Sequence, residues 1–120
     1  MANHHRGEID ALLDGTPYRL CLTLGALAEL EQAFGVEDML ALAERFSSGR
    51  MAARDAIRII GAGLRSGGHM IDDAAVGDMR VEGGAAGFVD VVARLLRATF
   101  GAANLPAASL PAESPPLGNV

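Results

Sequence analysis

The side chains that most often do chemistry are scarce and scattered in this 120-residue chain. The histidines are His4, His5 and His69, and the one cysteine is Cys21. His4 and His5 are neighbours, and adjacent side chains on an extended chain point apart. Metal binding needs further ligands at set spacings, which this pattern lacks. We therefore predict no metal site and interpret His69 as a solvated residue of a polar loop.

The residue types and their spacing give little indication of nucleophilic or acid–base catalysis. Cys21 has no histidine near it in sequence, so we favour a packing role, although proximity in space would still permit a nucleophile. No serine stands in the Gly-x-Ser-x-Gly pattern of a nucleophile elbow. Asp72 and Asp73 resemble paired carboxylates, but an acidic pair also begins many helices, which is the simpler interpretation. We predict no catalytic residue and no enzyme.

Two glycine-rich stretches are candidate phosphate loops. In "GAGLRSGG" (61–68), Ser66 occupies the last glycine position of a G-x-G-x-x-G loop, and the stretch ends a helix instead of following a strand. "GGAAG" (83–87) opens a helix, where free N–H groups could hold an anion. We favour close packing there, because no lysine or arginine follows to hold a phosphate. No cofactor is predicted.

The charge and hydropathy of the chain argue against nucleic acid and membrane as partners. The net charge is −5, and the ten basic residues are all arginine, interleaved with apolar and acidic residues. Such a chain is a poor ligand for nucleic-acid phosphates. No stretch reaches the roughly 18–20 apolar residues of a membrane span, and the first ten residues contain no secretory signal. We expect a cytoplasmic protein that binds neither nucleic acid nor membrane.

An N-terminal hairpin is predicted from alternation of period two. Residues 8–13 and 18–23 each place apolar side chains on one side, and "DGTP" (14–17) supplies an Asp-Gly turn between them. The apolar side chains are Ile9, Ala11 and Leu13 in the first run and Tyr18, Leu20 and Leu22 in the second. Pro17 should lie at a strand start or on an unpaired edge. A lone two-stranded hairpin is marginal in water, so it must lean on helices or a second chain.

Helical spacing of apolar residues predicts short helices over 24–34, about 37–46, about 51–65, after Asp72 and Asp73, and over about 85–99. The first begins after Thr23 as N-cap and ends at Gly35. The inward side chains expected in the next three helices are Met39, Leu42, Ala43 and Phe46, then Ala53, Ile57, Ile60 and Leu64, then Ala75, Val76 and Met79. Those of the last helix are Phe88, Val91, Val92, Leu95, Leu96 and Phe100.

The predicted fold class is therefore α+β and mainly α, with an N-terminal β-hairpin followed by about four to five short helices. We expect a disordered N-terminus at 1–6, a single domain at 7–101 and a disordered Pro/Ala-rich tail at 102–120. The tail holds four of the five prolines and shows no helical period. Pro and small residues cannot offset the entropy of ordering it.

Three segments together resemble one family. They are "NHHRGEIDALLDGTPYRLCLTLGALAELEQAFG", "GRMAARDAIRIIGAGLRSGG" and "EGGAAGFVDVVARLLRATFG". The chain resembles, over roughly residues 3–101, the small gene transfer agent family proteins of alphaproteobacteria. That family belongs with the phage tail assembly chaperones and is also labelled phage tail tube protein. The resemblance implies a role in building a phage-like tail, either as a chaperone of the helical tape-measure protein or as a tube or terminator subunit.

The residues favour the chaperone over the tube subunit. Tube subunits are built around extended β-sheets, whereas one short hairpin and about five helices are predicted here. A helix-rich body suits binding a helical protein, or other tail proteins, through apolar grooves. Self-association is a further expectation. The predicted partner-binding residues are the large apolar side chains of the first and last helices: Leu24, Leu27, Leu30, Phe34, Phe88, Val91 and Leu95.

Overall fold

The computed structural model of the protein describes residues 7–47 and 51–101. In this part of the chain, two strands precede five helices: β1 (Ile9–Leu13), β2 (Thr16–Leu20), α1 (Leu24–Phe34), α2 (Met39–Ser47), α3 (Ala53–Ser66), α4 (Asp73–Gly77) and α5 (Ala85–Phe100). The predicted α+β, mainly α class is confirmed. The expected disorder at 1–6 and 102–120 lies outside the described residues, and the division into one domain and two tails stays a prediction.

The hairpin turn is tighter than predicted. β1 and β2 are antiparallel with Leu13 opposite Thr16, so only Asp14 and Gly15 form the loop. Their φ angles are 54° and 74°, and positive φ at both positions is what a type I′ hairpin turn requires. β2 therefore starts at Thr16 and ends at Leu20, which corrects the predicted strand over 18–23. Pro17, second in β2, lies close to the strand start as expected.

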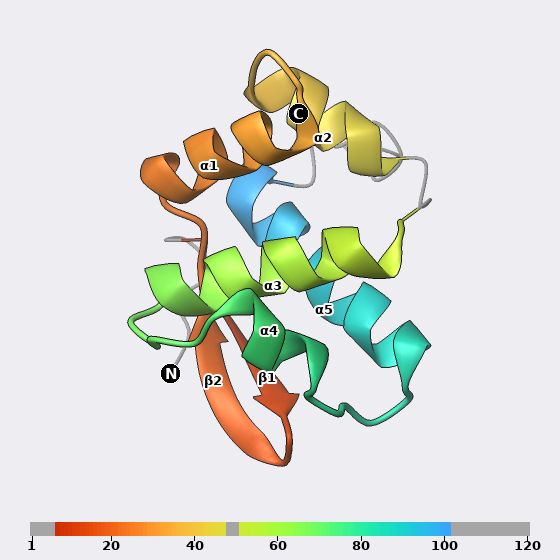
Figure 1. Ribbon diagram of the computed structural model, residues 1–120. Coiled ribbons are helices and arrows are strands. Elements are labelled where there is room, and N and C mark those ends of the chain that lie inside the picture. Colours follow the sequence, from red (N-terminus) through yellow and green to blue (C-terminus); the bar gives the residue numbers. More distant parts are fainter. Residues whose placement is uncertain (1–6, 48–50, 102–120) are drawn as a thin grey trace, which may run out of the picture.

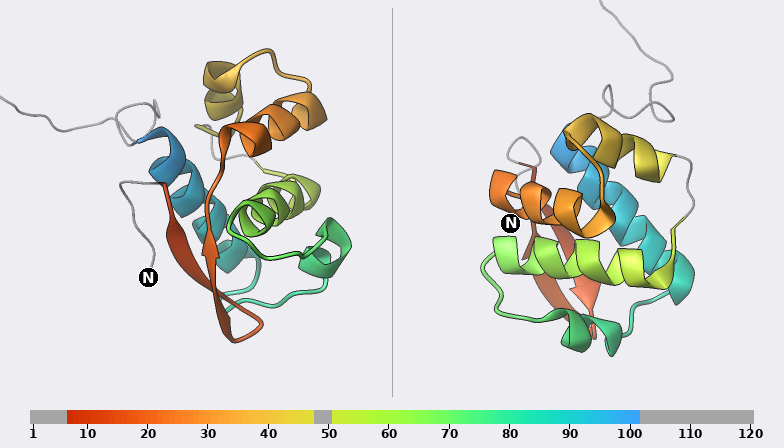
Figure 2. Two further views of the ribbon diagram at one scale, coloured as in Figure 1. Left: turned by 90° about the vertical axis from the view of Figure 1, so that its left-hand side faces the viewer. Right: turned by 45° about the horizontal axis from the view of Figure 1, so that its top comes forward.

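Helix α3 is the central element of the fold. It crosses the middle of the molecule, with α1 and α2 on one side, the hairpin and α4 on the other, and α5 behind it (Figure 1). The left view of Figure 2 looks nearly along the axis of α3, with these neighbours around it. Contacts join α3 to α1, α4, α5 and β2. The core accordingly gathers around α3, where Ile59, Ile60 and Leu64 are all fully buried.

Four side-chain predictions, in three helices, are wrong because they assumed one buried side for each helix. In α3, Ile59 is fully buried whereas Ala53 is exposed and Ile57 is only half-buried, since neighbours surround this helix on several sides. Met39 is 44% exposed because α2 packs chiefly against α1. Ala75 is exposed because α4 is a short helix that buries only Val76.

Glycine lets α3 lie close against its neighbours. A Cβ added to Gly63 would come within 2.8 Å of Leu95 Cδ2 and 3.2 Å of Leu20 Cδ2. A Cβ on Gly67 would collide with the carbonyl oxygen of Arg19. Gly67 also caps the helix at its C-terminus. The interpretation of residues 61–68 as a helix end is confirmed, and close packing explains the glycines inside α3.

Polar contacts tie the hairpin to segments far away in sequence. The Asp14 N–H donates to the Arg80 carbonyl at 2.7 Å, and the Arg80 N–H donates to Asp14 Oδ1 at 2.8 Å. Arg94 of α5 donates to the Asp10 carbonyl of β1 at 2.9 Å and to Asp90 at 3.0 Å. These contacts supplement the apolar packing that a two-stranded hairpin needs.

Candidate functional site

His69 is half-buried, which corrects the prediction of a solvated residue. Its ring lies edge-on to the Tyr18 ring, with centroids 5.0 Å apart and an interplanar angle of 87°. Its Nε2 is buried and makes no hydrogen bond to the described residues. The backbone after α3 folds back, since the His69 N–H donates to the Leu64 carbonyl at 2.9 Å. This long-range packing against β2 has no signal in the local sequence.

The other candidate chemical residues take structural roles. Cys21 lies just after β2, where its Sγ contacts the Ser66 carbonyl oxygen at 3.4 Å. Asp72 caps α4 by accepting from the Ala75 N–H at 2.9 Å. Asp73 instead pairs with Arg65 at 3.1 Å, so the two carboxylates are engaged separately. The helix-start interpretation of this acidic pair is confirmed.

The backbone makes a tight local turn at the start of α5, where residues 82–86 are exposed. Gly83 and Gly84 both have positive φ, and Gly84 is the N-cap residue. A Cβ on Gly87 would collide with the Glu82 carbonyl oxygen. The glycines of the 83–87 stretch therefore serve backbone geometry and close approach. Across residues 7–47 and 51–101, no group of three or more His, Cys, Asp or Glu could hold a metal ion. In the same ranges, no helix has the length and apolarity to cross a membrane.

Two apolar grooves are the strongest candidate functional surfaces. The α1–α2 groove, about 490 Å³, is lined by Leu22, Leu24, Leu27, Met39, Leu40, Ala43, Thr99 and Phe100. The α3–α5 groove, about 260 Å³, lies between α3, α4 and the start of α5, and its larger lining residues are Met51, Ile57, Ile60, Val76, Phe88 and Val89. Both are built from helices, so their natural ligands are apolar side chains presented by another chain.

The structure separates the predicted partner-binding residues into core and surface. Those in the core of this chain are Leu27, Leu30, Val91 and Leu95, each 5% exposed or less. They turn toward the protein interior because α1 and α5 both pack on α3. Leu27 still lines the α1–α2 groove. Partner contact stays a prediction for the more accessible residues, Leu24, Phe34 and Phe88.

The second helix supplies surface residues that the prediction missed. Met39 and Leu40 are both exposed and line the α1–α2 groove beside Leu24. A signal for this was present in the sequence. Two consecutive residues on a helix are about 100° apart, so a helix that packs chiefly on one neighbour leaves at least one of two consecutive large apolar side chains accessible.

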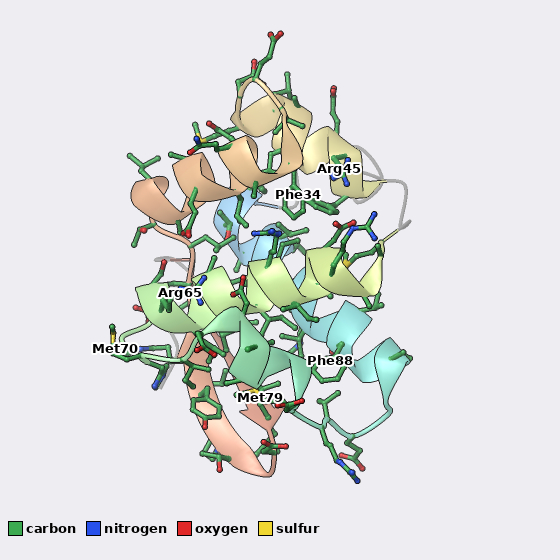
Figure 3. All side chains as sticks on the ribbon, in the orientation of Figure 1. Phe34, Arg45, Arg65, Met70, Met79 and Phe88 are labelled. Carbon is green, nitrogen blue, oxygen red and sulfur yellow. The ribbon has the colours of Figure 1, made fainter. Side chains whose placement is uncertain are left out.

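An aromatic and arginine cluster holds α2 in place. Phe34 of α1 and Phe46 of α2 pack edge to face with centroids 5.3 Å apart. The Arg45 guanidinium carbon lies 5.0 Å from the Phe34 centroid and 5.6 Å from that of Phe46. Arg45 also pairs with Asp55 of α3 at 3.6 Å, and Figure 3 shows Phe34 and Arg45 together where α1 and α2 face α3. This cluster sets the position of α2 and therefore the shape of the α1–α2 groove.

Comparison with known proteins identifies one family. The sequence profile of a family described as phage tail tube protein, GTA-gp10, matches residues 6–102. Neither the curated proteins nor the solved structures gave a match. The matched range contains the hairpin, all five helices of the described chain and both apolar grooves.

Proposed function

This chain belongs to the phage tail tube protein, GTA-gp10, family, and from that membership we propose that it is a non-enzymatic tail assembly chaperone. A role in a phage-like tail follows from the family. The chaperone activity and its target, the helical tape-measure protein, are our proposal. The observation that carries it is a helical body with two apolar grooves and, among the described residues, a sheet of only two strands.

The hairpin supports a chaperone better than a tube subunit. A tube wall built from extended sheets needs strands that can pair between subunits. Here the backbone after β2 is bound to α3 through the Cys21 N–H and the Gly63 carbonyl, 3.2 Å apart. The β1 side is contacted by Arg94 at the Asp10 carbonyl. Grooves between helices, by contrast, are a common way to hold another helix.

The roles of the reactive residues support a protein without catalytic function. Asp72 is engaged as a cap, Asp73 in an ion pair and Cys21 in packing. An active site needs several titratable groups that converge on one cavity. The α1–α2 and α3–α5 grooves are instead lined almost wholly by apolar side chains. The proposed chaperone acts in the bacterial cytoplasm, where it would hold the tape-measure protein until tail subunits assemble around it.

Co-expression tests the chaperone proposal. The tape-measure protein of the same gene cluster is produced alone, with this chain, or with an unrelated acidic protein of similar size. We expect this chain alone to raise the soluble fraction of the tape-measure protein and to co-purify with it. An unchanged soluble fraction, together with no co-purification, contradicts the proposal.

A structural tube or terminator subunit is the second candidate, favoured by the family description itself. The two roles differ in copy number within finished particles. Mass spectrometry of purified particles should find many copies of a structural subunit. A chaperone that leaves before the tail is complete should be absent from them.

A further inference from the structure

We propose that the α1–α2 groove binds an amphipathic helix of another protein, and that arginine or lysine beside the apolar stripe of that helix selects it. The inference rests on the proposed function and deepens it. It names the surface that holds the partner and the chemistry that the partner must carry. Three observations support it: exposed apolar side chains, an uneven charge distribution and a mismatch with the other possible occupants.

Exposed apolar side chains concentrate at this groove. Leu24 is 74% exposed, Leu40 is 63% exposed and Met39 is 44% exposed. Across the described residues, these are three of the six large apolar side chains that are exposed. All three line the α1–α2 groove. Clustered apolar side chains on a surface are typical of a binding site, whereas scattered ones need no explanation.

The negative charge of the protein concentrates on the same two helices. Residues 20–44 contain five acidic residues, Glu29, Glu31, Glu37, Asp38 and Glu44, and no basic residue. Elsewhere, the ten other acidic residues balance the ten arginines. The net charge of residues 20–44 is therefore −5, and the segment 24–47, which forms α1, α2 and their connection, carries −4 because it also contains Arg45.

Several of these carboxylates belong to the helix sides that border the groove. Glu31 follows Leu27 by four residues on α1, and Glu44 follows Leu40 by four residues on α2. Residues four apart are neighbours on a helix surface. Each of these two carboxylates therefore lies on the same side of its helix as a groove residue, one turn further along. Asp38 directly precedes Met39 and caps α2, accepting from the Ala41 N–H at 2.8 Å. An apolar groove with an acidic border matches an apolar stripe with basic flanks.

The third wall of the groove carries one positive charge. Arg97 lies in the last turn of α5, shortly before the groove residues Thr99 and Phe100. Arg45 of α2 is directed to α3, where it pairs with Asp55. Arg97 and Arg45 together do not offset the five carboxylates of α1, α2 and their connection. The potential at the groove is therefore dominated by negative charge, and like-charged partners are disfavoured.

Two other occupants fit less well. A second copy docked symmetrically would bring the same carboxylates against themselves, because a two-fold interface pairs a patch with itself. The C-terminal segment 102–120 begins two residues after Phe100, but it contains one glutamate, no arginine and four prolines. It offers no complementary charge, and proline interrupts helices. A basic amphipathic helix from a different protein is the occupant that satisfies both the shape and the charge.

Synthetic peptides test the charge selection. The full chain is titrated with a labelled helical peptide of about 18 residues, with leucine at i, i+3, i+4 and i+7 and arginine on both flanks. The control peptide keeps the leucines and carries glutamate on the flanks. Fluorescence anisotropy should show at least about tenfold tighter binding of the arginine peptide. Raising the salt from about 0.05 M to about 0.5 M should narrow the difference. Equal binding of the two peptides overturns the proposal.

Paired variants test the location. Leu24→Ser/Leu40→Ser alters two exposed groove residues, and Leu12→Ser/Met70→Ser alters two exposed residues that line neither apolar groove, 59% and 91% exposed. Met70 lies on the far side of α3 from α1 and α2 in Figure 3. The groove variant should bind the arginine peptide at least about tenfold more weakly, and the control variant within about twofold of the natural chain. Circular dichroism checks that both stay folded. The reverse pattern overturns the proposed surface.

A third variant separates charge from apolar contact. Glu31→Gln/Glu37→Gln removes two of the five carboxylates, and Glu82→Gln, outside residues 20–44, is its control. The double variant should lose affinity for the arginine peptide and gain affinity for the glutamate peptide. The control should change neither. An unchanged preference in the double variant contradicts the assigned role of the carboxylates.

Failure of the surface and failure of the function have different signatures. If the tape-measure protein co-purifies equally with the natural chain and with Leu24→Ser/Leu40→Ser, the chaperone function stands and the assigned groove is wrong. If the arginine peptide binds at the groove but the tape-measure protein does not co-purify, the groove assignment stands and the proposed function is wrong.

Discussion

At the scale of single residues, glycine decides how closely the elements of this protein approach. Gly63 lies within α3, where glycine is normally a cost to a helix. Its missing side chain leaves room for Leu20 from the hairpin and Leu95 from α5. Gly25 in α1 has no such reason, since a Cβ there would meet only Thr23 Oγ1, at 3.9 Å. The same residue type thus has opposite energetic roles in two helices.

Substitution of these two glycines should change stability in opposite directions. Gly63→Val overpacks the core and should lower the free energy of unfolding by about 1–3 kcal/mol. Gly25→Ala improves helix propensity and should raise it by about 0.5–1 kcal/mol. Urea denaturation followed by circular dichroism measures both. A neutral Gly63→Val would show that the contact among α3, β2 and α5 is loose.

Asp14 has two tasks at the hairpin turn. It adopts positive φ, and its carboxylate accepts the Arg80 N–H. Asp14→Ala loses the acceptor and tolerates the turn poorly, so it should destabilise the protein by about 1–2 kcal/mol. Asp14→Asn keeps an oxygen acceptor and tolerates positive φ, so its free energy of unfolding should stay within about 0.5 kcal/mol of that of the natural chain. If thermal unfolding shows that both variants lose the same amount of stability, this account is contradicted.

At the scale of elements, α2 has one extensively contacted neighbour, α1. It packs chiefly on α1 and reaches α3 through the Arg45–Asp55 ion pair. Arg45 also stacks on Phe34 and Phe46, so one side chain joins three helices. Because α2 supplies Met39 and Leu40 to the α1–α2 groove, its position controls the proposed binding surface.

Removal of the Arg45 side chain should loosen α2 selectively. Arg45→Ala loses stacking on two aromatic rings, so amide hydrogens of α2 should exchange about two- to fivefold faster. Amides in the middle of α3 should change little. Arg45→Lys keeps the charge but not the planar stacking, and should give an intermediate result. Uniform acceleration throughout the protein would mean that the cluster supports the whole fold.

At the scale of the whole molecule, charge and apolar exposure coincide. Segment 20–44 holds the excess negative charge, and its two helices carry Leu24, Met39 and Leu40 on the surface. The opposite part, around the hairpin and α4, is fastened by Asp14, Arg80 and Arg94. The proposed binding surface therefore lies in the part of the molecule that carries both the excess negative charge and three of the exposed apolar side chains.

Truncation tests the predicted division of the chain. If residues 7–101 are the complete folded unit, a chain that ends at Gly101 should have a free energy of unfolding within about 0.5 kcal/mol of that of the full chain. Its dissociation constant for the arginine peptide should also be within about twofold of that of the full chain. A strong gain in affinity after truncation would show that residues 102–120 compete for the α1–α2 groove.

Much of the local structure could be predicted because its causes lie within a few residues. Asp14 and Gly15 specify the hairpin turn through their backbone preferences. Thr23 caps α1, accepting from the Ala26 N–H at 3.1 Å, and Gly35 ends that helix with a φ of 68°. The family resemblance likewise rests on contiguous residues, and the family match at 6–102 confirms it.

The sequence by itself therefore determined the elements, their caps, the fold class and the family. Only the tertiary structure decided which side of each helix is buried, because burial depends on how many neighbours an element acquires. Ile59 is core since α3 is surrounded, whereas Leu24 and Leu40 stay exposed since α1 and α2 lie at the edge. The α1–α2 groove and the half-burial of His69 have the same origin, because both arise from segments that meet only when the chain is folded.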